Sequence, residues 1–231
     1  MNQFLVTVDI LSVLQFFDGD APGVNRHVAA VTATAGEDLG AGLIVDYFHR
    51  RGIEAEVLKK KKENAPKNVT TGTGKGHWLD RWIHVCCNGK HIYYQTEIKN
   101  WSAHSMKGKC IPVDVSPDEL AKHKIERWKN VWKGTTFRGK GVRKVLDYME
   151  PPKPKSKVRP MICFWDAMHP NGADEPLFSH KVEADYFDRV WVFSMSAYLR
   201  QLLSEGTQVI QLEMMDTANR LEWIGKMFPS T

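Results

Sequence analysis

Residues 79–99 read LDRWIHVCCNGKHIYYQTEIK, and this stretch decides the fold that the sequence predicts. Two runs rich in β-branched and aromatic residues flank Asn88-Gly89. An Asn-Gly pair between such runs is the strongest short signal for a two-residue hairpin turn. With that turn Cys87 pairs with Lys90, and the register that follows sets Asp80 directly opposite Glu97.

The second strand of this hairpin places charged side chains on one face. Like charges directly opposite each other are destabilising, so the opposed carboxylates of Asp80 and Glu97 need a reason. A divalent cation between them supplies one, because carboxylate oxygens are the ligands that Mg²⁺ prefers. Lys99, on the same face as Glu97, would hold a water or a phosphate beside the ion, an arrangement suited to phosphodiester hydrolysis. The pleat assigns Ile92, Tyr94, Thr96 and Ile98 to a core face, and Tyr93, Gln95, Glu97 and Lys99 to a polar face.

A purely structural alternative stays open for these charges. In it, Asp80 lies in the loop before the strand, and Glu97 and Lys99 form an exposed salt bridge on an edge strand. The hairpin turn and the opposition of Asp80 to Glu97 favour the metal site.

A helix is predicted before the hairpin, over residues 34–51. Thr34 and Glu37 have capping-box spacing, and Gly52 follows as the expected C-terminal stop. Glu37 leans toward the sheet, and both a capping role and a role in the site stay open for it. The helix is expected to bury one apolar stripe, formed by Leu39, Leu43, Ile44, Tyr47 and Phe48.

Elements further along the chain continue an alternation of strands and helices. A short strand is predicted over 53–58, and a helix capped by Ser116 runs to about Trp132. Residues 150–160, EPPKPKSKVRP, are read as a basic linker or a long surface loop. Residues 160–231 are expected to complete the sheet and cover it, with strands near 161–168, 189–195 and 207–214 and helices near 196–206 and 217–228. This order predicts an α/β fold, with a mixed central β-sheet flanked by helices, in one domain over 1–231.

These residues resemble the PD-(D/E)xK nuclease superfamily. The resemblance covers about residues 34–135 and rests on GEDLGAGLIVDYFHRRG, WLDRWI and EIKNW; Leu79 stands where the family name has proline. It implies a restriction-endonuclease-like core (α-β-β-β-α-β) with a C-terminal elaboration. It also implies that Asp80, Glu97 and the Ile98 carbonyl bind Mg²⁺, which Mn²⁺ can replace. Lys99 would then position the attacking water, and Glu37 would be the accessory acid.

The charge distribution indicates a polyanionic partner. The chain has 231 residues and a net charge of +5, and basic runs lie at 59–62, 138–144 and 153–159. Such runs beside a metal site suit a groove that follows a nucleic-acid backbone, most simply DNA. RNA cleavage, a binding or assembly module without cleavage, a homodimer and partner proteins all stay open. The candidate substrate contacts are Lys75, His104, Gln95, Lys59 and Lys60.

Other classes of site are disfavoured by the sequence. TTGTGKGHW lacks two positions of the phosphate-binding loop pattern. A zinc site is not expected at His77, His84 and His91, because the latter two are assigned to different faces. The four cysteines form no C-x-x-C pair and are expected to be reduced. We find no signal peptide and no spanning segment, so the expectation is a soluble cytoplasmic protein.

Overall fold

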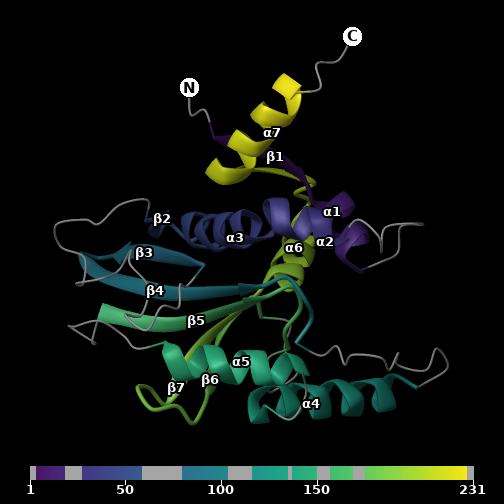
Figure 1. Ribbon diagram of the computed structural model, residues 1–231, viewed down its shortest axis with the longest axis vertical. Helices are drawn as coiled ribbons and strands as arrows, with labels where there is room; N and C mark the ends of the chain where they lie inside the picture. Colours follow the sequence, from purple (N-terminus) through teal and green to yellow (C-terminus); the bar gives the residue numbers. More distant parts are fainter. Residues whose placement is uncertain are drawn as a thin grey trace.

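The computed structural model describes residues 4–18, 28–58, 80–103, 116–134, 137–149, 157–168 and 175–227. Its centre is a mixed six-stranded sheet in the order β2-β3-β4-β5-β7-β6, flanked by helices (Figure 1). The predicted α/β class is therefore confirmed. The strands of this sheet are β2 (Glu54–Val57), β3 (Arg81–Cys87), β4 (Lys90–Lys99), β5 (Val158–Phe164), β6 (Leu177–Lys181) and β7 (Arg189–Ser194).

The hairpin has the predicted turn and the predicted register. Asn88 and Gly89 both have positive φ angles, 50° and 72°, as a two-residue hairpin turn of this kind requires. Antiparallel pairing runs from Cys87 opposite Lys90 to Arg81 opposite Thr96. On its other side β4 pairs in parallel with β5. Strand β4 is thus an interior strand of the sheet.

The helix before the hairpin begins earlier than predicted. It starts as α2 (Val28–Val31), passes through a π-helical turn (Thr32–Gly36) and continues as α3 (Glu37–His49). The Thr34 hydroxyl donates to the Ala30 carbonyl at 2.8 Å, and α3 has no side-chain cap. The predicted capping box of Thr34 and Glu37 is therefore wrong. The predicted stop at Gly52, with φ of 69°, is confirmed.

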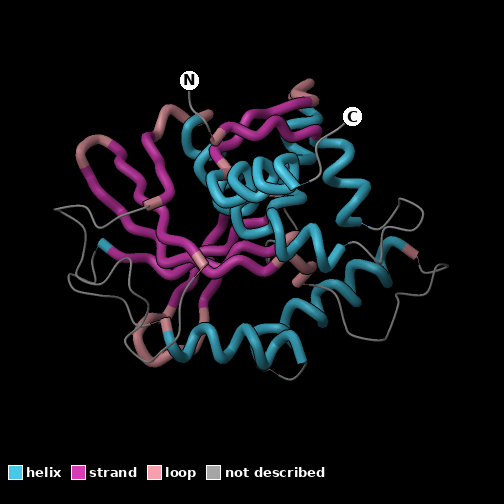
Figure 2. The backbone as a smooth tube through the Cα atoms, turned by 45° about the horizontal axis from the view of Figure 1, so that its top comes forward, coloured by secondary structure: helices cyan, strands magenta, loops and turns pink. Residues whose placement is uncertain are grey.

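Helix α3 is buried on more than the single stripe that was predicted. Gly40 lies against the Ile98 side chain of the central sheet, and Gly42 lies against Leu212. Leu212 belongs to β8 (Val209–Glu213), which pairs with β1 (Leu5–Asp9) in a separate two-stranded sheet. Figures 1 and 2 place this small sheet on the far side of α3 from the central sheet. Two layers cover α3, so both of its faces are apolar.

The remaining helices cover the two faces of the central sheet. On one face, α4 (Pro117–Lys133) and α5 (Phe137–Tyr148) pack on β5, β7 and β6. On the other lie α1 (Ile10–Asp18), α3 and α6 (Met195–Ser204), and α7 (Met215–Met227) follows β8. The capping box of Ser116 and Glu119 at the start of α4 is confirmed. No helix among the described residues is both long and apolar enough to cross a membrane.

Part of the predicted linker belongs to the sheet. Residues 150–156 lie outside the described residues, but Val158 and Pro160 are in β5. Pairing of β5 with β7 begins only at Met161, so at Pro160 this side of β5 has no paired strand in the described part of the chain and the missing N–H is tolerated. Elements that the sequence did not indicate are β1, α1, α5 and β6.

Candidate active site

Three of the predicted site residues meet where β3 begins and β4 ends. Asp80 directly precedes β3, and its Oδ2 accepts the backbone N–H of Ile98 at 2.7 Å. Lys99 Nζ donates to Glu97 Oε1 at 2.6 Å. Because β3 stops at Arg81, the Ile98 N–H is left for the Asp80 carboxylate to bind. The turn and register thus bring two carboxylates and one ammonium group together.

Glu97 of the acidic pair is buried, and Asp80 is half-buried. Glu97 is 5% exposed, and among the described residues its Oε2 has no hydrogen-bond partner. Burial, together with the charges of Glu97 and Glu37, raises the pKa of Asp80 to about 7, although the Ile98 N–H and Lys99 act in the opposite direction. An unpartnered buried carboxylate oxygen is costly unless a cation or a donor compensates it.

The expected environment of β4 needs two corrections. The structural alternative placed Glu97 and Lys99 on an edge strand, but β4 is paired on both sides. The face that was predicted to be polar is also covered: Tyr93 is 1% exposed and belongs to an apolar cluster with Trp82 and Val158. The acidic pair therefore lies at the margin of a packed face, where each charge is more costly than on a solvated surface.

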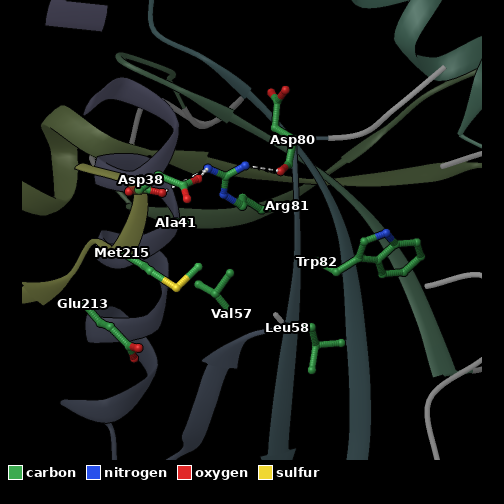
Figure 3. Close-up of a pocket in the computed structure, with 10 residues that line it drawn as sticks. Asp38, Ala41, Val57, Leu58, Asp80, Arg81, Trp82, Glu213 and Met215 are labelled. Atoms are coloured by element: carbon green, nitrogen blue, oxygen red, sulfur yellow. Dashed lines mark hydrogen bonds and ion pairs between the residues drawn. The ribbon is translucent and has the colours of Figure 1, made fainter. Parts of the chain in front are cut away.

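Glu37 reaches this site through Arg81. Arg81 Nη1 donates to Glu37 Oε2 at 3.0 Å and to the Asp80 carbonyl at 2.7 Å. Its Nη2 donates to Asp38 at 3.0 Å and to Asp216 at 2.8 Å, and these carboxylates raise the pKa of Arg81. In Figure 3 the Asp80 side chain points away from the guanidinium group. Arg81 therefore holds the backbone carbonyl of Asp80, and the Asp80 carboxylate is directed to the opposite side.

Asp38 is a residue of this network that sequence reasoning missed. It is buried, and its Oδ2 accepts the Thr217 N–H at 2.8 Å and the Thr217 hydroxyl at 3.1 Å. This ties the first turn of α7 to α3 and to Arg81, around a cavity of about 250 Å³ (Figure 3). The two residues are 179 positions apart, so no local pattern signals the contact.

Asp38→Ala is expected to lower the free energy of unfolding by about 1–3 kcal/mol, because it leaves the Thr217 N–H and part of Arg81 without a buried acceptor. Urea denaturation measures the change. Asp216→Ala is the matched control, since the Asp216 side chain is 42% exposed and its removal should cost less. Equal losses in the two variants would contradict this role of Asp38.

Of the predicted substrate contacts, the structure describes only Gln95. Lys59, Lys60, Lys75 and His104 lie outside the described residues. Gln95 is 1% exposed within the sheet, so the structure does not open it to a substrate.

The donor set at the pair fits a hard divalent cation. One carboxylate comes from the residue before β3 and the other from β4, and one oxygen is buried without a partner in the described part of the chain. Within that same part no three His, Cys, Asp or Glu side chains form a metal-binding group. The ligand set predicted for Mg²⁺ is not a group of this kind, because it consists of the carboxylates of Asp80 and Glu97 and the backbone carbonyl of Ile98.

Comparisons with protein-family models, curated proteins and solved structures find no match for this chain.

Proposed function

We propose that this chain is a Mg²⁺-dependent nuclease that hydrolyses phosphodiester bonds, with DNA as its substrate. The observation that carries the proposal is the pair of half-buried Asp80 and buried Glu97, with Lys99 beside it; Glu97 Oε2 has no hydrogen-bond partner among the described residues. A protein that only binds nucleic acid has no need for two neighbouring carboxylates, whose repulsion destabilises the fold.

The order of the elements supports the resemblance to PD-(D/E)xK nucleases. Helix α3 is followed by the antiparallel strands β2, β3 and β4, then by α4 and α5, and then by β5 parallel to β4. Apart from the additional helix α5, this order agrees with the α-β-β-β-α-β order that the resemblance implies. Asp80 stands before the second of these strands and Glu97 near the end of the third, as the family motif expects.

Each residue of the site has a proposed role that follows from its surroundings. Asp80 and Glu97 would hold Mg²⁺ together with the Ile98 carbonyl. The bound ion would lower the pKa of an attacking water and neutralise charge that develops on the phosphate. Lys99, now paired with Glu97 at 2.6 Å, would turn to donate to the water or to a phosphate oxygen. Glu37 would act through Arg81, which contacts both Glu37 and the Asp80 backbone.

The surface of α4 and α5 supports a polyanionic substrate. These two helices cover the β5-β7-β6 half of the face that carries Glu97 and Lys99. Among their described side chains, the exposed cations on this layer are Lys122, Lys129, Lys133, Lys140 and Lys144. Contacts of this kind bind the phosphate backbone without reading the sequence, and they make binding salt-dependent.

Incubation of the purified chain with plasmid, linear duplex, single-stranded DNA and RNA tests the proposed function. We expect cleavage of DNA in Mg²⁺ or Mn²⁺ and none with chelator. Cleavage of RNA alone would move the assignment to a ribonuclease. Salt-sensitive binding without cleavage of any substrate would favour a binding module instead.

A further inference from the structure

A second polar cluster lies at the turn end of the same hairpin, around His84 and His91. The sequence assigned these two histidines to different faces, and that prediction was wrong. His91 pairs directly with Cys86, and Cys86 is two residues from His84 in β3. Paired residues share a face, as do residues two apart in a strand, so all three side chains lie on one face.

The two histidines and a glutamate form a hydrogen-bonded chain. His84 Nδ1 lies 2.9 Å from Glu56 Oε1, and His84 Nε2 lies 2.9 Å from His91 Nδ1. The ring planes differ by only 13°, and the centroids are 5.1 Å apart. The N–N distance and the radii of the two rings together nearly equal the centroid separation. These two nitrogens therefore lie nearly on the line that joins the ring centres. His84 is 8% exposed, so this chain is largely enclosed at its centre.

The direction of these hydrogen bonds determines which nitrogen of His91 is available. The Glu56 carboxylate only accepts, so the hydrogen-bond network assigns a proton to His84 Nδ1. With His84 neutral, its Nε2 accepts the Nδ1–H of His91. The lone pair of a neutral His91 is thereby fixed on Nε2. A ligating histidine almost always donates its other N–H to an acceptor that orients it, and His91 already does so.

Two further donor side chains stand in the same row of the sheet as His91. Glu54 pairs with Cys86, and Cys86 pairs with His91, so three adjacent strands present a carboxylate, a thiol and an imidazole side by side. Directly paired residues have Cβ atoms about 4.5–5.5 Å apart. All three line a cavity of about 670 Å³, which Glu56 and His84 also border.

We propose that His91 Nε2, Cys86 Sγ and Glu54 bind Zn²⁺, with His84 and Glu56 as the outer partners that orient His91. Nitrogen, thiolate and carboxylate oxygen are all ligands of this borderline-soft ion, and a water would take the fourth position. The Cys86 thiol releases its proton to solvent when it binds. Among the described residues no three such side chains are close enough to form a metal-binding group. Binding of the ion would therefore require the side chains of Cys86 and Glu54 to turn toward His91. The bound ion would cross-link β2, β3 and β4.

Titration of Co²⁺ into the full chain after chelator treatment tests this site. With excess Mg²⁺ present to occupy the acidic pair, one Co²⁺ should bind per chain, with visible d–d bands and a thiolate-to-metal charge-transfer band, and Zn²⁺ should displace it. Cys86→Ser should remove the charge-transfer band, and His91→Ala should weaken binding at least about tenfold. His84→Gln should weaken binding about 10–100-fold through the loss of the outer partner.

Cys87→Ser is the matched control, because Cys87 is the next residue of β3, is exposed and lies on the opposite face. It should bind Co²⁺ as the wild type does, and so should Lys99→Ala, since the proposal does not depend on nuclease activity. Absence of Co²⁺ binding, or a charge-transfer band that survives Cys86→Ser in a folded variant, would overturn the proposal and leave a hydrogen-bonded histidine pair.

Discussion

Asp80→Asn is expected to abolish metal-dependent cleavage while it stabilises the metal-free protein. The asparagine oxygen still accepts the Ile98 N–H, but it no longer repels the charges of Glu97 and Glu37. We expect a loss of at least about 10³-fold in cleavage rate, because one of two charged ligands of the ion is gone. In metal-free protein at pH 8, we expect a gain on the order of 2 kcal/mol in the free energy of unfolding.

The pH dependence of stability distinguishes this explanation from a simple packing change. The pKa of Asp80 is about 7 in the folded chain, above the ordinary value of 3.8 for an aspartate. The folded state therefore binds more protons than the unfolded state between these values, so this contribution to stability is present at low pH and is lost as pH rises toward 7. Urea denaturation of metal-free protein from pH 4 to 8 should show this loss in the wild type and not in Asp80→Asn. Parallel curves would contradict the account.

Lys99→Ala is expected to lower the cleavage rate about 10²–10⁴-fold and to leave nucleic-acid binding nearly unchanged. Lys99 contacts Glu97, and in the proposed mechanism its ammonium group acts on the water or the phosphate and does not supply general affinity. Single-turnover cleavage and a binding isotherm in chelator separate the two effects.

Lys90→Ala is the control for that variant, because Lys90 is an exposed lysine at the other end of the same strand. It should retain wild-type cleavage. If Lys99→Ala also retained it, the proposed role of Lys99 would be wrong, whereas equal losses in both variants would indicate a general charge effect on substrate binding.

The sequence predicted those parts of the site that depend on local pattern. The Asn88-Gly89 turn specifies the register by itself, and the register brings Asp80, Glu97 and Lys99 together. The strand and helix order followed from the same kind of signal. Helix α5 was missed because glycines and basic residues hide its periodicity, and both are common in loops.

Contacts between distant segments could not be predicted in this way. Arg81 binds carboxylates on α3 and α7, and Asp38 binds Thr217 across 179 residues. The burial of both faces of α3 also required the small β1–β8 sheet, which forms from the two ends of the described chain. The shared face of His84 and His91 was predictable from the register, because His91 pairs with Cys86, two residues from His84.

Binding of Mn²⁺ to the chelator-treated protein, followed by the loss of the free-ion signal in electron paramagnetic resonance, tests the central claim most directly because it needs no substrate. The account predicts that the wild type binds Mn²⁺, that Mg²⁺ displaces it, and that Asp80→Asn and Glu97→Gln both lose this Mg²⁺-displaceable binding. Binding that is unchanged in these two variants, or absent from the wild type, would contradict the assignment of the acidic pair as a metal site.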